Sequence, residues 1–252
     1  MKSEFAGTTA QYYAEYRRDL PMEQVRALAA HIGLRADDIA VDLGCGTGQI
    51  AVPLATHCAA VIAIDPEPDM LAGLRARRAE RVLCVLGDDH DLPRLSVPLT
   101  GPIGLVTIGN ALHWMDERST LSAAASILRP DGAIAIVTQG PPLWLGPAPW
   151  QTRVREALES LYGPVSGNCR TDQSALDERR AMAAGLGLDT EVLSWRAAYP
   201  VTVDWVLGHL ASALSPHQLE KTEELRTLLQ GLDHDEIVEE VTTTVLVARR
   251  GS

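Results

Sequence analysis

Aromatic residues, paired cysteines and long apolar runs are all scarce in this sequence. Only 4% of its 252 residues are aromatic, with a single Phe, so the core has to be built mainly from Leu, Val, Ile and Ala. No apolar run approaches the length of a membrane span. The polar N-terminus lacks the apolar stretch of a signal peptide. We therefore expect a cytoplasmic protein without membrane contact.

The four cysteines form no CxxC pair, which excludes the usual pattern of a zinc site and of a disulfide framework. They are Cys45, Cys58, Cys84 and Cys169. We expect them to be buried structural thiols and predict no metal site.

Basic residues are in the minority, because 22 Lys and Arg stand against 33 Asp and Glu, a formal net charge of -11. Since binding to nucleic acid requires a basic face, nucleic acid is not expected as a partner. A negative field instead favours a cationic ligand. The length and the 46% hydrophobic content are ordinary for one α/β domain.

Strands and helices alternate through the first half of the chain. After two helices at 8–19 and 21–32, the pattern predicts strands at 39–43, 60–65, 81–87, 103–109 and 133–138, with helices at 48–57, 66–78 and 116–128. Continuous apolar strands between helices are typical of a parallel sheet covered on both faces. Beyond Gly140 we expect a loop, helices at 151–162 and 172–185, a β-rich stretch at 190–202, helices at 203–212 and 216–231, and a last strand at 241–249.

The segment 39–50, IAVDLGCGTGQI, carries the most specific chemical signal. Its strand runs to Asp42, and three glycines follow at Gly44, Gly46 and Gly48 before a helix. Glycines allow a sharp turn and a close approach of ligand to backbone. Amides at the N-terminus of the helix can then bind the ligand's polar groups. Because Gly46-x-Gly48-x-x-Ala51 also fits the dinucleotide fingerprint, the turn alone leaves NAD and S-adenosylmethionine open.

Acidic residues at the ends of three successive strands favour S-adenosylmethionine. Asp42, immediately before the glycines, suits an ammonium group and would repel a pyrophosphate. Asp65 ends the second strand, where a carboxylate can accept both ribose hydroxyls, a feature that NAD-binding proteins share. Gly87-Asp88-Asp89 ends the third strand and offers a carboxylate to an amine such as that of adenine.

These segments, with ALHWMD and LRPDGAIAIVT, occur in the order and spacing of class I S-adenosylmethionine-dependent methyltransferases. The chain resembles the small-molecule subgroup that contains UbiE and trans-aconitate methyltransferase, and Tyr13-Ala-Glu-Tyr16-Arg17 resembles the Tyr-x-x-Tyr-Arg pattern of its N-terminal helix. The resemblance runs from about residue 8 to 139 and resumes weakly at 201–213 and in the last strand. In one departure, many relatives have Phe-Asp where this chain has Ile103-Gly104.

The resemblance implies a Rossmann-like seven-stranded, mostly parallel α/β sheet with the last strand antiparallel, helices on both faces and a helical cap over the active site. Within a single domain of 1–252, we expect N-terminal lid helices at 1–33, a cofactor-binding core at 34–139 and a substrate cap at 140–190. The remaining segment, 191–252, should complete the sheet.

The resemblance also implies a methyl transfer from S-adenosylmethionine to an oxygen, nitrogen or carbon atom of a small molecule, in secondary metabolism, with S-adenosylhomocysteine as product. The implied cofactor-binding residues are Tyr13, Arg17, Asp42, Gly44, Gly46, Gly48, Asp65, Met70, Asp88, Asp89 and Asn110. For Met70, a place in the core is an equal alternative. Two other functions remain open on this fold: a cyclase-like enzyme that does not methylate, and a sensor of the cofactor or its product.

His113 follows the fourth strand, at the edge where α/β sheets bind ligands, and is a candidate general base. Alternatively, it shapes the pocket together with Trp114. Asp116 is expected to cap the next helix. The tyrosines around Arg17 form either a lid or a helix docked on the sheet edge. The aromatic residues predicted to wall the acceptor site are Trp114, Trp144, Trp150 and Tyr162, with Trp205 and His209 in the same region.

Overall fold

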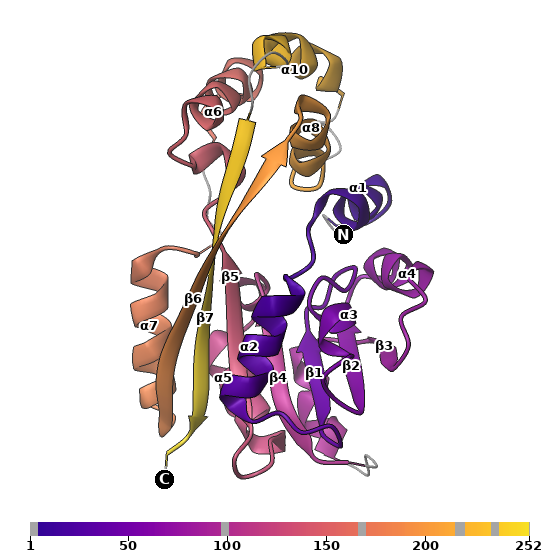
Figure 1. Cartoon of the computed structure of the whole chain (residues 1–252), viewed down its shortest axis with the longest axis vertical. Helices are drawn as coiled ribbons and strands as arrows, with labels where there is room; N and C mark the ends of the chain where they lie inside the picture. The colour runs from indigo at the N-terminus through magenta and orange to yellow at the C-terminus, as the bar shows by residue number, and fades with distance from the viewer. Residues whose placement is uncertain (1–4, 97–100, 166–169, 215–219, 233–236, 252) are drawn as a thin grey trace.

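The sheet has seven strands in the order β3-β2-β1-β4-β5-β7-β6 (Figure 1). The computed structural model describes residues 5–96, 101–165, 170–214, 220–232 and 237–251. The strands are β1 (Ile39–Leu43), β2 (Ala60–Asp65), β3 (Val82–Leu86), β4 (Ile103–Gly109), β5 (Ala133–Gln139), β6 (Leu188–Val201) and β7 (Ile237–Arg250). The first five pair in parallel, and β7 lies antiparallel between β5 and β6. The predicted fold is confirmed.

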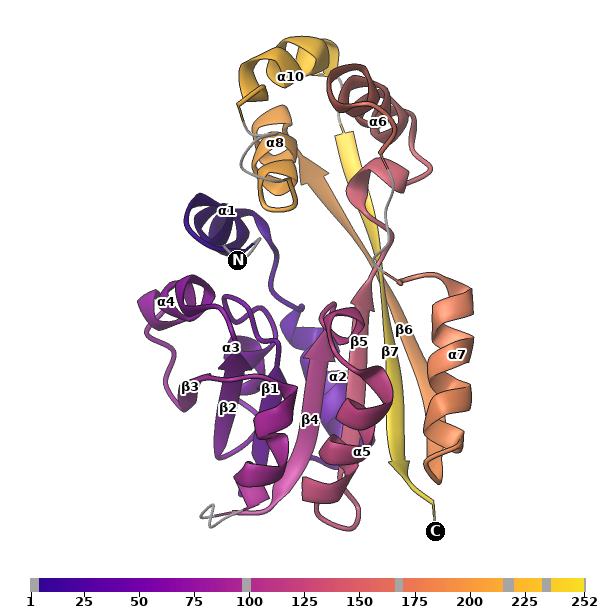
Figure 2. The ribbon, with the colours of Figure 1, turned by 180° about the vertical axis from the view of Figure 1, so that it is seen from behind.

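Helices cover both faces of this sheet, as Figures 1 and 2 show. Alternate residues of β5 divide between the two layers: Ile134 and Ile136 pack with α5 and α7, whereas Ala133 and Ala135 pack with α2, α3 and α4. Strands buried on both faces explain the continuous apolar runs in the sequence. The helices are α1 (Thr8–Tyr16), α2 (Met22–Ile32), α3 (Ala51–Leu54), α4 (Pro68–Ala76), α5 (Glu117–Ile127), α6 (Pro149–Tyr162), α7 (Gln173–Ala184), α8 (Val203–Ala211) and α10 (Thr222–Leu229), with short 3-10 turns η1 (Asp89–Ser96), η2 (Leu112–Trp114), η3 (Leu143–Leu145) and η4 (Gln230–Leu232).

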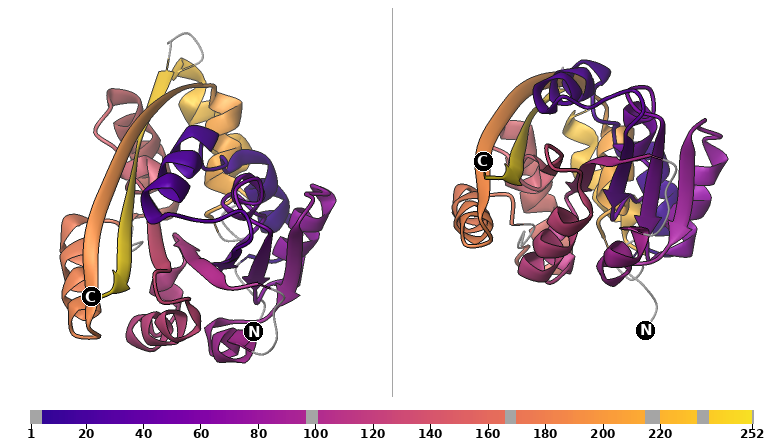
Figure 3. Two further views of the ribbon diagram at one scale, coloured as in Figure 1. Left: turned by 60° about the horizontal axis from the view of Figure 1, so that its bottom comes forward. Right: turned by 90° about the horizontal axis from the view of Figure 1, so that it is seen from below.

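Two elements differ clearly in length from their predictions. The helix expected at 48–57 forms only as α3, because residues 44–50 are a turn in which the three glycines have positive φ. The last strand is longer than the predicted 241–249, because β7 pairs with β6 along its whole length. Both strands continue past the end of β5, and β6 curves along its length (Figure 3). Of the helix expected at 216–231, residues 216–219 lie outside the described residues.

The helical cap is built from other segments than the predicted 140–190. Helix α7 packs on the sheet beside α5, whereas η3 and α6 join α8 and α10 in a separate hydrophobic cluster above the sheet (Figures 1 and 2). Residues of that cluster include Leu143 and Leu158 before β6 and Leu207 and Leu225 after it. We call α6, α8, α10, η3 and η4 the cap. The cap extends beyond the predicted boundary at residue 190, because β6 leads from the sheet to α8 and α10 in the cap and β7 returns the chain to the sheet.

Helix α1 lies between the sheet and the cap, packed against both α4 and α8. A Cβ at Gly208 of α8 would lie 2.4 Å from the ring of Tyr16. The missing side chain at Gly208 therefore makes the room in which the Tyr16 ring docks. On the α4 side, the amide of Gly7 donates to Asp69 at 2.7 Å.

The departure at Ile103-Gly104 has a structural reason. A Cβ at Gly104 would lie 2.4 Å from Oδ2 of Asp38, which is fully buried. Asp38 pairs there with Arg129, whose Nε donates to Oδ1 at 3.0 Å. Gly104 thus leaves space for an acid that comes from another part of the chain.

Three of the cysteines fall within the described residues. Cys45 and Cys58 are buried, as predicted, and Cys84 is half-buried. Cys169 lies outside the described residues. Within the described ranges, every helix is too short or too polar to cross a bilayer.

Candidate active site

A cavity of about 520 Å³ lies where the carboxyl ends of β1, β4 and β5 face α1 and the cap. Parallel α/β sheets bind ligands at this edge. Of the predicted site residues, the cavity brings together Tyr13, Arg17, Asp42, Gly44, Asn110, His113, Trp114 and Trp144.

Asp42, at the end of β1, lines the cavity with a carboxylate that is only half satisfied. Its Oδ1 accepts from Thr107 Oγ1 at 2.7 Å, while its Oδ2 is buried without a partner in the described structure. Burial raises the pKa of Asp42 to about 7, while the bond from Thr107 and the nearby backbone amide of Ala51 act in the opposite direction. A buried acceptor of this kind is stabilised by a cationic hydrogen-bond donor, such as the ammonium group of an amino acid.

The glycine turn after β1 holds its shape through close contacts. A Cβ at Gly44 would lie 2.5 Å from Cβ of Ala111, in the segment after β4. A Cβ at Gly48 would lie 2.3 Å from Leu74 of α4, so Gly48 serves packing and does not line the cavity. The amide of Gly46 donates to Asp65 at 2.8 Å. The turn is therefore fixed by the protein's own groups, with Gly44 as its cavity-facing glycine.

The residues predicted for the adenosine half lie outside this cavity. Both carboxylate oxygens of Asp65 accept backbone amides, from Gly46 and from Glu67, and each keeps a second lone pair for a further donor. Met70 is 3% exposed and packs in the interior. Asp88 accepts from the amide of His90, and Asp89 accepts from Thr120 at 3.0 Å. Their roles toward a nucleoside stay predictions.

Residues of α1 connect the glycine turn to the cap. The ring of Tyr13 would contact a Cβ at Gly46 at 3.4 Å. The guanidinium of Arg17 lies 5.2 Å from the Tyr13 ring centroid, and its Nε donates to Ser212 at 2.7 Å. Burial raises the pKa of Tyr13, which keeps the phenol neutral. This placement supports the interpretation of α1 as a lid.

His113 and Trp114 lie side by side on η2, with ring centroids 5.0 Å apart, and both line the cavity. Burial lowers the pKa of His113, and the charges of Arg179 and Arg170 lower it further. The neutral ring is therefore favoured near pH 7, as a general base requires. The predicted cap at Asp116 is confirmed, since its Oδ1 accepts the amide of Ser119 at 2.9 Å.

Two of the four predicted acceptor-wall residues lie elsewhere. Trp150 is 7% exposed and donates its Nε1 to the carbonyl of Val238 at 3.0 Å, within the core of the cap. Tyr162 packs against the same core, with the ammonium of Lys221 5.6 Å from its ring centroid. Neither residue lines the cavity, because the apolar side of α6 packs toward α8 and α10.

The structure adds cavity residues that the sequence analysis did not select, among them Arg18, Ser212 and Glu239. Arg18 pairs with Glu239 and lies over the rings of Tyr199 and Trp205 at 4.3 and 3.9 Å. Arg18 adjoins the Tyr-x-x-Tyr-Arg pattern, and Ser212 lies in the weak resemblance at 201–213, so both had a local signal. Glu239 had none.

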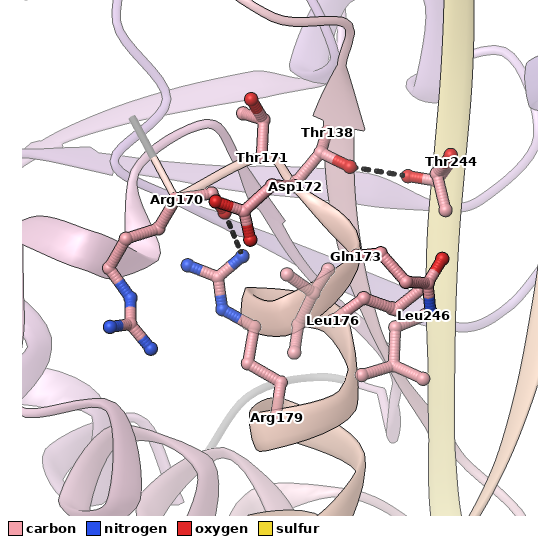
Figure 4. Close-up of a pocket in the computed structure, with 10 residues that line it drawn as sticks. Thr138, Arg170, Thr171, Asp172, Gln173, Leu176, Arg179, Thr244 and Leu246 are labelled. Atoms are coloured by element: carbon pink, nitrogen blue, oxygen red, sulfur yellow. Dashed lines mark hydrogen bonds between the residues drawn. The ribbon is translucent and has the colours of Figure 1, made fainter. Parts of the chain in front are cut away.

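A second cavity, of about 70 Å³, lies beside the start of α7 (Figure 4). Arg179 closes it by donating to the carbonyl of Arg170 at 2.9 Å and to Glu117 at 3.0 Å. Thr171 lines both cavities. Both guanidiniums pair with Glu117. The charges of Arg179 and Arg170 lower the pKa of His113, and the charge of Glu117 raises it.

Part of the chain is similar in sequence to known methyltransferases. Residues 40–132 match the sequence profile of the family described as "Methyltransferase domain". An uncharacterized methyltransferase of Mycobacterium tuberculosis is 30% identical over 131 residues, 52% of this chain and 50% of that protein. A trans-aconitate 2-methyltransferase of Methylobacterium radiotolerans is 32% identical over 112 residues, 43% of this chain and 41% of the relative. The chain spans about half the length of the curated relatives it matches first.

Solved structures show the same fold. A SAM-dependent methyltransferase from Geobacter sulfurreducens, in complex with S-adenosyl-L-homocysteine, superposes with a TM-score of 0.55 at 17% identity, covering 99% of this chain and 100% of that one. The described residues fit such a cofactor, because the unpartnered oxygen of Asp42 lies beside the glycine turn in a cavity open to α1. Residues 40–132 are thus similar to a methyltransferase domain, and the chain shares its fold with an S-adenosylmethionine-dependent methyltransferase.

Proposed function

We propose that the protein transfers a methyl group from S-adenosylmethionine to an oxygen, nitrogen or carbon atom of a small molecule bound in the 520 Å³ cavity. The observation that carries this proposal is the buried, unpartnered Oδ2 of Asp42 beside Gly44. The cavity volume falls within the range of about 300–1,000 Å³ common for small-molecule sites. With the net charge of -11, this supports a small-molecule acceptor over a nucleic acid.

The residues divide the work between holding the cofactor and covering it. Asp42 holds the ammonium group. Asn110, the residue after β4, has a φ of 48° and offers its backbone to the same group from the other side of the glycine turn. Tyr13 and Arg17 close over the methionine end and exclude water. Bound S-adenosylmethionine supplies a methyl group already activated by its sulfonium. Alignment therefore contributes most, with effective molarities that can reach ~10⁵ M.

We also propose that the acceptor is a secondary metabolite and that the protein acts in the cytoplasm. What supports the first is the aromatic wall made by Trp114, Trp144 and Tyr199, which suits a compact apolar molecule. A cyclase that keeps the cofactor, or a sensor of it, would bind S-adenosylmethionine without transferring its methyl group. The aromatic residues that line the rest of the cavity, such as Trp144 and Tyr199, favour an enzyme that binds a methyl acceptor beside the cofactor.

Calorimetric titration tests the cofactor assignment. We expect S-adenosylhomocysteine to bind and NAD not to bind, since a carboxylate at position 42 attracts an ammonium group and repels a pyrophosphate. Incubation with methyl-labelled cofactor and a pool of small molecules then separates the enzyme from a cyclase or sensor, which would form no S-adenosylhomocysteine. Tight NAD binding without binding of S-adenosylhomocysteine would overturn the proposal.

A further inference from the structure

Two neighbouring arginines after α1 line the main cavity and differ in their partners. Arg18 pairs with Glu239 on β7. It also lies over the rings of Tyr199 and Trp205. Arg17 is half-buried and makes no ion pair within the described residues. Since charges that leave water are normally paired, Arg17 carries a positive charge that an anionic ligand would neutralise.

A side chain of the cap fixes how the Arg17 guanidinium is turned. Its Nε donates to Oγ of Ser212 at 2.7 Å, and Ser212 is 1% exposed. Ser212 directly follows α8, and its hydroxyl donates to the carbonyl of His209 at 2.6 Å. Because a hydroxyl has a single proton, this bond leaves only its lone pairs for Arg17. The carbonyl end of α8 also carries partial negative charge, which favours a cation beside it.

The far end of the same guanidinium is available to a ligand. The bond to Ser212 uses one of its five N–H groups. The others, on the two terminal nitrogens, have no partner within the described residues, and neither of these nitrogens is buried. Since Arg17 lines the cavity, this end of its side chain is open to it.

We propose that Ser212 is a positioning residue, which turns the Arg17 guanidinium so that its terminal nitrogens bind a carboxylate in the main cavity. This inference rests on the proposed function and deepens it. The planar fork of a guanidinium matches the two oxygens of a carboxylate. A single unpaired cation also matches a single negative charge. A doubly charged phosphate would need a second cation, and Arg18 is already paired.

Under the proposed function, two molecules bring this chemistry to the cavity. One is the cofactor, whose methionine part carries a carboxylate beside the ammonium group. The other is a methyl acceptor that is itself a carboxylic acid. Arg17 stands between both ends of the cavity, because α1 lies between the sheet and the cap (Figure 1) and Ser212 belongs to the cap side. Binding measurements on each molecule separate the two sources.

The quantity to measure is the carboxylate preference, the dissociation constant of a ligand without the carboxylate divided by that of its counterpart with it. Calorimetric titration gives both constants. For the cofactor, the pair is S-adenosylhomocysteine and its decarboxylated analogue S-adenosyl-3-thiopropylamine, which keeps the ammonium group and the nucleoside. For the acceptor, the pairs are benzoate, phenylacetate and hexanoate with their primary amides, titrated into the S-adenosylhomocysteine complex.

In the wild type we expect a preference of about tenfold or more for one of the two sources, the factor that a charge-assisted hydrogen bond contributes at its lower end. Preference in the first pair assigns the carboxylate to the cofactor. Preference in one of the acid and amide pairs assigns it to the acceptor.

Three variants and a control assign the preference to these side chains. Arg17→Gln removes the cation and should abolish it. Ser212→Ala leaves every charge in place and should lose most of it, because the guanidinium is no longer held in one direction. Ser212→Thr keeps a hydroxyl and should restore it. The control, Arg18→Gln with Glu239→Gln, removes the neighbouring pair at constant net charge and should keep it.

A purely structural role of Ser212 predicts a different result. If its hydroxyl only held the cap together, Ser212→Ala would weaken the binding of both members of a pair by the same factor, and the preference would not change. We expect instead that S-adenosyl-3-thiopropylamine binds Ser212→Ala as tightly as it binds the wild type. That binding also shows that the variant is folded.

Failure of this inference can be told from failure of the proposed function. If S-adenosylhomocysteine does not bind, the proposed function fails. If it binds but the wild type shows no preference for either source, or if Arg17→Gln keeps the preference, the carboxylate site is overturned while the proposed function stands. A preference that is equal in Ser212→Ala and in the wild type overturns the positioning role of Ser212.

Discussion

At the scale of single residues, the buried carboxylate of Asp42 that would bind the cofactor lowers the stability of the ligand-free protein when it is ionised. Its pKa in the folded protein is about 7, raised by burial from the usual 3.8. Between these values the unfolded chain loses the proton first, so the free energy of unfolding falls as pH rises and is level above about pH 7. At 1.36 kcal/mol per pKa unit, this group lowers the stability of the ligand-free protein by about 2–3 kcal/mol between pH 5 and pH 8.

Asp42→Asn should therefore remove that pH dependence while abolishing cofactor binding. We expect the stability difference between variant and wild type, from urea unfolding, to shift in favour of the variant from pH 5 to pH 8. In the wild type, S-adenosylhomocysteine affinity should fall about tenfold per pH unit below pH 7, since binding requires the ionised carboxylate. A stability difference that is the same at both pH values would show that Asp42 titrates normally.

The sequence predicted the cofactor end of the site better than the acceptor end. Asp42 and Gly44 lie on one strand and the turn that follows it, so a short motif carries their geometry. The acceptor end is assembled by α1, η3, α8 and β7, which meet only through the tertiary structure. Trp150 was assigned to this end because it is aromatic, yet the direction in which α6 turns it depends on the cap core.

At the scale of elements, α1 depends on a glycine in the helix it packs against. Gly208 lies within α8, where replacement by Ala would ordinarily stabilise a helix by about 0.5–1 kcal/mol. Its Cβ would nevertheless lie 2.4 Å from the Tyr16 ring. We expect Gly208→Ala to displace α1 and weaken S-adenosylhomocysteine binding, measured by calorimetry, with an overpacking cost of about 1–3 kcal/mol in stability.

The double variant Gly208→Ala with Tyr16→Ala provides the control, because it removes the ring that would clash. Its loss of stability should be smaller than the sum of the two single losses, as expected for residues in contact. Fully additive effects would mean that the α1–α8 contact does not control the lid.

Element ends that local chemistry sets were predicted correctly. Element ends that depend on pairing between strands were predicted wrongly. Asp116 was correctly predicted to begin α5, because a capping side chain acts within one turn. The ends of β7 depend on β6, a partner some 50 residues away in the chain, and no local pattern marks them. The glycine at position 104 likewise depends on a distant part of the chain, since the Asp38 side chain occupies the space beside it.

At the scale of the whole molecule, the cap has a hydrophobic core of its own. The cluster around Val154, Leu210 and Leu229 shares no residue with the two clusters on the faces of the sheet. Links between cap and sheet include β6, β7 and the contact of α1 with α8. Separate cores favour separate opening, because one can lose its packing while the other remains intact.

We therefore expect native-state hydrogen exchange to distinguish the two parts. Amides of α8 and α10 should exchange through an opening with a lower free energy and a weaker denaturant dependence than amides of β1 and β4. S-adenosylhomocysteine at about 100 times its dissociation constant should raise the exchange free energy of β1 and β4 amides by about 2.7 kcal/mol, since it binds only the folded state. It should protect α10 less, because α10 does not line the cavity, whereas α1 should gain protection through Tyr13 and Arg17. Equal free energies and equal denaturant slopes in cap and sheet would show instead that the molecule opens as one unit.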